Sequence, residues 1–257
     1  AGGGADGMVD WMPSALAARE KGLPLVNIAQ PFKSSGMMLT CRKDMGVNST
    51  DDLKGKTLGV WFYGNEYPFL SWMSRLGLAT DGSANGVTVL KQGWGVEPLT
   101  EGQAACVSTM SYNEYWVVRD AGYTPEQLTV FKYQAEGAST LEDGLYVLEK
   151  NLGDDSFKDK MVRFVRASMK GWKYAEANPK EAASIILDND DAGVQTEKHQ
   201  IRMMGEIAKL TAGSNGSLDP SDYERTVKVL MSGASDPVIT KEPSGAWTHD
   251  ITNAALN

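Results

Sequence analysis

Long apolar runs are missing from this sequence, and none approaches the roughly 20 residues that a membrane-spanning helix needs. Cysteine is scarce as well, because only Cys41 and Cys106 occur and they form no C-x-x-C pair. This absence excludes zinc ribbons and thioredoxin-like redox motifs. In an exported chain the two cysteines could form one bridge, and two buried free thiols would be equally ordinary. The sequence leaves both states open.

Histidine is nearly absent, since the only two are His199 and His249 in the C-terminal part. No G-x-S-x-G or H-E-x-x-H motif occurs, and a catalytic Ser–His or Cys–His pair would have to recruit one of these distant histidines. Residues 2–7 match G-x-G-x-x-G literally, but a dinucleotide-binding loop follows a strand and opens a helix, whereas a strand candidate follows here. We therefore expect no catalytic residue, no metal site and no cofactor.

Basic residues are outnumbered, because 25 Lys and Arg stand against 33 Asp and Glu, a formal net charge of −8 at pH 7. An acidic protein repels phosphate backbones and anionic lipid headgroups, so we expect no nucleic acid partner. Aromatic residues are plentiful, with 7 Trp, 9 Tyr and 6 Phe among 257 residues. This apolar area predicts a folded globular protein of one or two domains.

Strand-like and helix-like patterns alternate up to residue 150. Several strand candidates are runs of consecutive apolar residues, which are typical of strands buried on both faces. The predicted strands are 7–11, 25–29, 37–42, 57–62, 87–91, 104–110, 128–133 and 145–149, and helices are predicted at 13–21, 66–76 and 112–121. The alternation favours an α/β architecture with mostly parallel sheets, in which 7–11 and 25–29 are buried parallel strands.

The pattern after residue 150 is helical. Apolar residues recur there every three or four positions, which predicts one amphipathic helix with Phe157, Met161, Val165, Met169 and Trp172 on its buried face. Further helices are predicted at 178–187, 196–210, 219–233 and 247–256. The second half of the chain is therefore expected to be a mainly helical part.

Three loops that follow predicted strands combine aromatic rings with carboxylates, and a fourth stretch, 136–144, is acidic and flanked by glycines that would suit a hinge. In open α/β sheets ligands bind beyond the carboxyl ends of strands, where aromatic faces and a few polar groups suit a small molecule. The candidate ligand-binding residues are Asp10, Trp11, Met12, Phe62, Tyr63, Asn65, Glu66, Thr109, Tyr112, Asn113, Glu114, Glu142 and Asp143. The alternatives are core packing for the aromatics, helix capping for the asparagines and glutamates, and an ordinary surface loop at 136–144.

The step Asp-Leu-Lys-Gly-Lys at 52–56, just before a predicted strand, resembles the entry to the second lobe of type II periplasmic binding proteins. Segments 4–11 and 140–149 resemble the same family, and the resemblance covers nearly the whole chain. The class in question serves ABC importers of thiamine-precursor pyrimidines, riboflavin, sulfonates, taurine and nitrate. The resemblance implies lobe one at 1–41 and 145–257, lobe two at 42–144, and a ligand cleft between them.

The same resemblance implies a non-enzymatic solute-binding protein that is exported to the periplasm or another extracytoplasmic space, acts as a monomer and delivers its ligand to a membrane permease. The acidic candidates favour an aromatic solute with amino groups, such as a thiamine-precursor pyrimidine, because carboxylates repel anions. Trp11, Phe62, Tyr63 and Tyr112 would stack on its ring. The alternatives are a sulfonate, taurine or nitrate binder, and a pyrimidine-synthesising enzyme of the same fold, which depends on a histidine and a cysteine-rich patch.

Family members carry further strands and helices ahead of the segment that matches 2–10, beginning with a strand–helix unit. About 60 residues of that pattern are absent from this sequence, by comparison with the usual layout of such domains. We therefore expect the native protein to be longer at its N-terminus, with a secretion signal ahead of the missing strand. That strand is expected to carry part of the ligand site.

Overall fold

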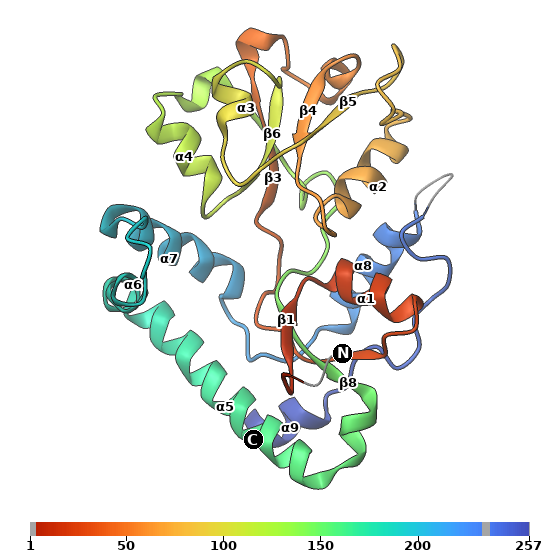
Figure 1. The fold of residues 1–257 in the computed structure, drawn as a ribbon, viewed down its shortest axis with the longest axis vertical. Coiled ribbons are helices and arrows are strands. Elements are labelled where there is room, and N and C mark those ends of the chain that lie inside the picture. The colour runs from red at the N-terminus through yellow and green to blue at the C-terminus, as the bar shows by residue number, and fades with distance from the viewer. Residues whose placement is uncertain (1–3, 233–236, 257) are drawn as a thin grey trace. The chain divides into compact units, whose positions relative to one another are not determined.

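The computed structural model describes residues 4–232 and 237–256, and the chain forms two compact units (Figure 1). Unit 1 comprises Ala1–Ser35, Thr140–Met231 and Ile239–Asn257, and unit 2 comprises Gly36–Ser139 and Ser232–Val238. Each predicted strand is present, with ends within about two residues of those expected. Gly2 and Gly3 of the rejected glycine motif, and Gly233 at an expected helix end, lie outside the described residues.

The sheet of unit 1 is antiparallel, which corrects the expectation of mostly parallel sheets. It contains β1 (Met8–Asp10), β8 (Gly144–Leu148) and β2 (Leu25–Ala29) in the order β1-β8-β2, and β8 runs antiparallel to both neighbours. Strand β1 is also not buried as expected, because Val9 is 65% exposed. Apolar runs reveal burial but not direction, and β8 enters between β1 and β2 from much later in the chain.

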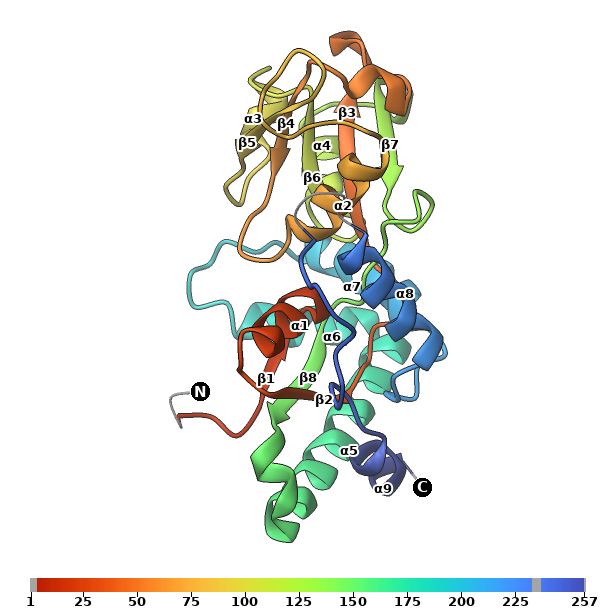
Figure 2. The same ribbon diagram turned by 90° about the vertical axis from the view of Figure 1, so that its right-hand side faces the viewer.

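The helices of unit 1 follow the predicted pattern. Helix α5 (Asp155–Ala177) begins where the Asp154 side chain accepts hydrogen bonds from two backbone N–H groups of its first turn. Phe157, Met161, Val165 and Met169 of the predicted stripe are buried in one cluster with residues of β2, β8 and α9 (Asp250–Leu256), which lies beside α5 (Figure 2). The other α-helices described for unit 1 are α1 (Met12–Glu20), α6 (Pro179–Asp188), α7 (Glu197–Thr211) and α8 (Pro220–Met231).

Unit 2 contains a mixed five-stranded sheet in the order β5-β4-β6-β3-β7. Its strands are β3 (Met37–Arg42), β4 (Thr57–Val60), β5 (Thr88–Lys91), β6 (Cys106–Met110) and β7 (Leu128–Lys132). Strand β4 is parallel to β5 and β6, whereas β3 is antiparallel to β6 and β7. The expectation of parallel strands is therefore correct only for β5, β4 and β6, whose carboxyl ends share one edge of the sheet.

Helices α2 (Tyr67–Arg75) and α4 (Glu114–Asp120) follow β4 and β6, as predicted, and a short helix α3 (Glu97–Thr100) was not predicted. Cys41 and Cys106 lie opposite each other on β3 and β6 and form a disulfide. Both are fully buried. The sequence allowed either a disulfide or two free thiols, and the structure contains the disulfide.

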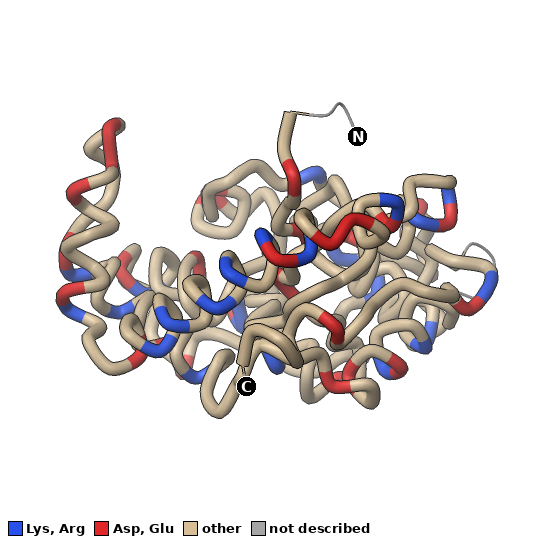
Figure 3. Tube along the Cα trace, turned by 90° about the horizontal axis from the view of Figure 1, so that it is seen from below, with Lys and Arg blue, Asp and Glu red and all other residues tan. Residues whose placement is uncertain are grey.

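Figure 3 marks the acidic and basic residues of the described chain, and in α5 the acidic Asp155 and Asp159 lie in the first two turns, followed mainly by Lys and Arg. Lys158 pairs with Asp155, and Arg163 pairs with Asp159, so this helix presents charges of both signs to solvent. Within the described ranges, no helix has the length and apolar character required to cross a bilayer.

Candidate functional site

The end of β1 brings together three predicted residues of unit 1. Asp10, the last residue of β1, lies opposite Gly144, the first residue of β8, and Asp143 directly precedes Gly144. The backbone N–H of Trp11 donates to Asp10 Oδ1 at 2.8 Å. Asp10, Trp11 and Asp143 together form the acidic edge of unit 1.

Both carboxyl groups of the acidic edge are partly withdrawn from water. Burial raises the pKa of Asp10 above its usual range, against a lowering by the bond from the Trp11 backbone. Burial also raises the pKa of Asp143, and the negative charge of Asp10 raises it further, while a hydrogen bond with the Trp11 side chain acts in the opposite direction. A ligand that supplies a cation or N–H donors would relieve both effects.

A buried polar network lies behind the acidic edge. Asn27 Nδ2 donates to Gln30 Oε1 at 3.0 Å, and Gln30 Nε2 donates to the backbone oxygen of Glu142 at 2.5 Å. The Glu142 side chain is fully buried, and its Oε1 accepts from the Ser35 hydroxyl at 2.7 Å. A Cβ at Gly144 would collide with the ends of the Asn27 and Gln30 side chains, so a larger residue there would have to displace this network. The structure places Glu142 inside unit 1, where it supports the loop that carries Asp143.

Glu114 is the main polar group at the end of β6 in unit 2. Its Oε2 accepts from the backbone N–H of Met110 at 2.9 Å, and its Oε1 accepts from Asn113 Nδ2 at 2.7 Å. Burial raises the pKa of the Glu114 carboxyl, and these hydrogen bonds reduce the rise without cancelling it. Glu114 is therefore a desolvated carboxyl held in one orientation at the carboxyl end of a parallel strand.

The helix-capping alternative does not describe the residues that precede α2 and α4. Glu66 and Asn113 occupy the N-cap positions, but neither side chain makes a capping hydrogen bond to its helix. Glu66 Oε2 instead accepts from the backbone N–H of Gly64 at 2.7 Å, and Asn65 Nδ2 donates to the backbone oxygen of Phe62 at 3.3 Å. These bonds shape the loop after β4, which carries Phe62 and Tyr63.

The rings of Phe62 and Tyr63 lie near Lys91, the last residue of β5. The Lys91 ammonium is 5.7 Å from the centre of the Phe62 ring and 4.7 Å from that of Tyr63. It also donates to the Tyr63 hydroxyl at 3.2 Å. A cation over aromatic rings is attracted by their negative faces, so Lys91 holds this loop in place.

Two other predicted site residues lie in the cores of their units. Met12 is fully buried at the start of α1, and its backbone N–H donates to Leu141 O at 3.1 Å. Thr109 is fully buried in β6, where its hydroxyl is 2.7 Å from that of Thr40. Met12 and Thr109 therefore fit the alternative of core packing. Tyr112, in contrast, is half-buried just after β6.

Sequence reasoning missed Asn27, Gln30, Lys91 and Trp94. The first two are polar residues in and after an otherwise apolar strand, and the structure makes them the support of the acidic edge. Trp94 lies between two glycines, three residues after the end of the strand 88–91, a pattern that could have drawn attention to it. The sequence does not show that the Trp94 side chain is 95% exposed, as it is in the structure.

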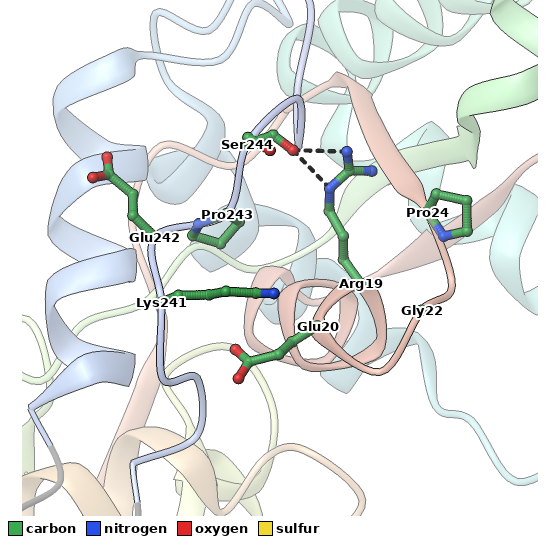
Figure 4. A pocket seen from close by; sticks show the side chains of 8 residues that line it. All are labelled: Arg19, Glu20, Gly22, Pro24, Lys241, Glu242, Pro243 and Ser244. Atoms are coloured by element: carbon green, nitrogen blue, oxygen red, sulfur yellow. Dashed lines mark hydrogen bonds between the residues drawn. The ribbon is translucent and has the colours of Figure 1, made fainter.

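A separate cavity of ≈ 310 Å³ lies within unit 1 (Figure 4). It is lined by Arg19, Glu20, Gly22, Pro24, Lys241, Glu242, Pro243 and Ser244. Two nitrogens of Arg19 donate to Ser244 O at 2.7 and 3.0 Å, and the Glu20 carboxylate accepts from the backbone and hydroxyl of Thr240. These hydrogen bonds hold the segment 240–244 against the end of α1, so Arg19 and Glu20 have a structural role at this cavity.

Comparison with known proteins places these features in a family. The chain matches the protein family described as NMT1/THI5 like over residues 1–182. It is 23% identical over 229 residues to the formylaminopyrimidine-binding protein of Halalkalibacterium halodurans, and the match covers 86% of this chain and 67% of that protein.

Two solved structures share the fold at low identity. The periplasmic sulfonate-binding protein SsuA of Methylobacillus flagellatus KT has a TM-score of 0.66 at 14% identity, over 99% of this chain and 75% of that one. The desulfurization enzyme DSZB also has a TM-score of 0.66 at 14% identity, over 97% and 84% of the two chains. The fold is the α/β fold of type II periplasmic binding proteins. Because the family match spans well over half of its residues, this chain belongs to the NMT1/THI5-like family.

Proposed function

We propose that this protein is the solute-binding component of an ABC importer and that it captures a small aromatic solute with amino groups, of the thiamine-precursor pyrimidine type. Its family membership and its similarity to a formylaminopyrimidine-binding protein support this proposal. The proposal includes export from the cytoplasm and transfer of the solute to a membrane permease, with the protein acting as a monomer. The similarity in fold to a periplasmic binding protein is in keeping with this role.

The choice of an amino-bearing solute rests on three carboxyl groups that are partly buried and lack an ion-pair partner among the described residues. Asp10, Asp143 and Glu114 have pKa values that burial raises. Asp10 is the last residue of β1, Asp143 directly precedes β8, and Glu114 begins the helix that follows β6. Among the residues that the structure describes, no lysine or arginine forms an ion pair with any of the three. A desolvated carboxylate gains most from a donor that carries positive charge or several N–H groups. Amino groups on a heteroaromatic ring provide such donors, whereas a sulfonate or nitrate would be repelled.

We propose that the carboxyls of the acidic edge in unit 1 and of Glu114 in unit 2 each recognise amino groups of the solute and that aromatic residues of the strand-end loops in each unit contact its ring. Trp11, Phe62, Tyr63 and Tyr112 supply these rings, and Asn65, Glu66 and Asn113 order the loops that carry them. Met12, Thr109 and Glu142 support these positions from within their units. The proposal requires no chemical step.

A ligand panel tests the proposed solute class. At a concentration of about 100 times Kd, a ligand stabilises the folded protein by about 2.7 kcal/mol, which corresponds to a Tm increase of about 5–10 °C for a chain of this size. We expect this increase with the formylaminopyrimidine and related aminopyrimidines, measured by thermal denaturation and by calorimetric titration. Stabilisation by taurine, an alkanesulfonate or nitrate, but not by pyrimidines, would contradict the solute class.

Substitution of Asp143 by asparagine is expected to separate binding from stability. The pKa of Asp143 is raised in the folded protein, so the protonated carboxyl is the stabilising form. Its contribution to stability is lost as the pH rises from the ordinary pKa of 3.8 through the raised pKa. Asp143→Asn is therefore expected to increase the free energy of unfolding at pH 7 relative to the wild type, with a smaller difference at pH 4. Loss of a charge-assisted bond is expected to raise the Kd for an aminopyrimidine about 10-fold or more.

Asp81→Asn provides the matched control, because hydrogen bonds from Ser83 lower the pKa of this exposed carboxyl. The pKa shift of Asp81 is opposite in sign to that of Asp143, so the ionised form of Asp81 is the stabilising one. The Asp81→Asn variant is therefore expected to be less stable than the wild type at pH 7 and equal to it at acid pH. Urea denaturation at both pH values measures the difference for each variant. The raised pKa of Asp143 would be refuted if the stability of Asp143→Asn, measured relative to the wild type, were lower at pH 7 than at pH 4.

A further inference from the structure

Trp94 is the most exposed large hydrophobic residue described in the chain, and Tyr63 is second. Trp94 is 95% exposed and Tyr63 is 86% exposed, although Trp and Tyr are largely buried in most proteins. Trp94 lies between Gly93 and Gly95 in the loop after β5, and Tyr63 lies in the loop after β4. Two large rings are thus held in water by neighbouring loops of unit 2.

Tyr63 has a backbone conformation that tyrosine rarely adopts. Its φ angle is +67°, in the left-handed region, and it is the only residue other than glycine with positive φ in the described chain. Two hydrogen bonds accompany this conformation: Lys91 donates to the Tyr63 hydroxyl, and Glu66 accepts from the backbone N–H of the next residue, Gly64. Strain that is maintained by several contacts is concentrated at functional sites, so it points to a role for the exposed ring.

The two loops are joined at one edge of the sheet. Trp61 Nε1 donates to the backbone oxygen of Gly93 at 2.9 Å, which ties the loop after β4 to the loop after β5. Strands β5, β4 and β6 are adjacent and parallel, so Glu114, which follows β6, is at the same edge. With strands about 4.8 Å apart, the ends of β5 and β6 are separated by about 10 Å, the length of a substituted heteroaromatic molecule.

We propose that Tyr63 and Trp94 form an aromatic subsite that stacks on the planar ring of the solute and selects aromatic over aliphatic ligands. This inference rests on the proposed function and adds Trp94 to it. Lys91 lies over the Tyr63 ring, and the exposure of that ring leaves surface for a second planar partner. Stacking on an exposed ring is tolerant of substituents, so Glu114 would recognise the amino groups while the subsite recognises the ring.

The size of the patch favours a small solute over a protein partner. A stable protein interface buries about 800 Å² on each side, whereas a Trp and a Tyr together offer about 300–500 Å². That area matches one or two rings of a small molecule. The neighbouring carboxyl of Glu114, with its burial-raised pKa, also suits a ligand that enters among the strand ends rather than one that rests on the outer surface.

The test compares Trp94→Ala and Trp94→Phe with the wild type by calorimetric titration with the formylaminopyrimidine and with taurine. We expect Kd for the pyrimidine to increase about tenfold in Trp94→Ala and by less in Trp94→Phe, which keeps a ring. The pyrimidine is also expected to quench tryptophan fluorescence in the wild type and to quench it less in Trp94→Phe. Since Trp94 is 95% exposed, both variants should keep the wild-type Tm.

Phe164→Ala is the control, because Phe164 is 52% exposed on α5 in unit 1 and its removal should leave Kd unchanged. Tyr63→Gly adds a second readout, since glycine adopts positive φ freely. We expect this variant to bind the pyrimidine more weakly while its Tm stays equal or increases. A merely structural tyrosine would lower Tm when removed.

Each outcome decides the proposal. Pyrimidine binding that is equal in the wild type and Trp94→Ala would overturn the aromatic subsite and leave the proposed function intact. Binding of taurine with no binding of the pyrimidine would overturn the subsite and the proposed solute class, while an importer of another solute would remain. Failure to bind either ligand or any planar heteroaromatic of the panel would overturn both proposals.

Discussion

Replacement of both Cys41 and Cys106 by alanine is expected to lower the free energy of unfolding by about 2–4 kcal/mol. The disulfide closes a loop with a sequence separation of 65 residues, and it therefore restricts the unfolded chain strongly. It joins directly opposed residues of β3 and β6, two central strands of unit 2. Urea denaturation of the oxidised wild type and of the double variant measures the difference.

The reduced wild type serves as the control for this prediction, because it lacks the bridge but keeps both side chains. It is expected to resemble the double variant in its urea midpoint, apart from the small effect of the missing sulfur atoms. Both cysteines are fully buried, so the reductant should act mainly after unfolding, and reduction should be carried out in denaturant before refolding. If the oxidised and reduced proteins had equal midpoints, the predicted contribution of the bridge would be refuted.

Replacement of Glu114 by glutamine is expected to raise the Kd for an aminopyrimidine about 10- to 100-fold, because a charge-assisted hydrogen bond is worth about 1.5–3 kcal/mol. Glutamine keeps the size of the side chain but removes its charge. It also places an NH₂ group beside donors that now face carboxylate oxygens, namely the Met110 N–H and the Asn113 amide. Calorimetric titration gives the Kd values.

Glu101→Gln is the matched control for the loss of one negative charge from unit 2. Glu101 is exposed at the end of α3, and its Oε2 accepts only from the Gln103 side chain among the bonds described. We expect this variant to bind the aminopyrimidine with the wild-type Kd. Equal affinities of all three proteins would show that Glu114 does not contact the solute, and stronger binding by Glu114→Gln than by the wild type would show that the charge of Glu114 disfavours the aminopyrimidine and would contradict the prediction.

The strands and helices could be predicted from the sequence because their signals are local. The stripe from Phe157 to Met169 repeats with the helical period, and it is buried in the core of unit 1 as expected. Strands 25–29 and 37–42 are bounded by polar or glycine-containing segments and match β2 and β3 residue for residue. Periodicity and breakers act over a few residues, so no long-range contact is needed to recognise them.

The candidate site was predictable to the extent that it follows strand ends. Asp10 and Asp143 are 133 positions apart, yet both border loops at predicted strand ends, and the pairing of β1 with β8 brings them together. The sequence could not separate Asp143 from the adjacent Glu142, because the direction of each side chain depends on the register of β8. In the structure Glu142 is fully buried, whereas Asp143 belongs to the acidic edge.

Local patterns in the sequence were enough to predict the α/β class, the order of the elements, the helical second half and the acidic, aromatic character of the loops. The antiparallel insertion of β8, the bridge between Cys41 and Cys106, and the strained, exposed position of Tyr63 beside Lys91 appear only in the folded chain. These features all depend on contacts between residues far apart in the chain. Such contacts are selected by the packing of whole elements, and the free energy that selects them is not contained in any local pattern.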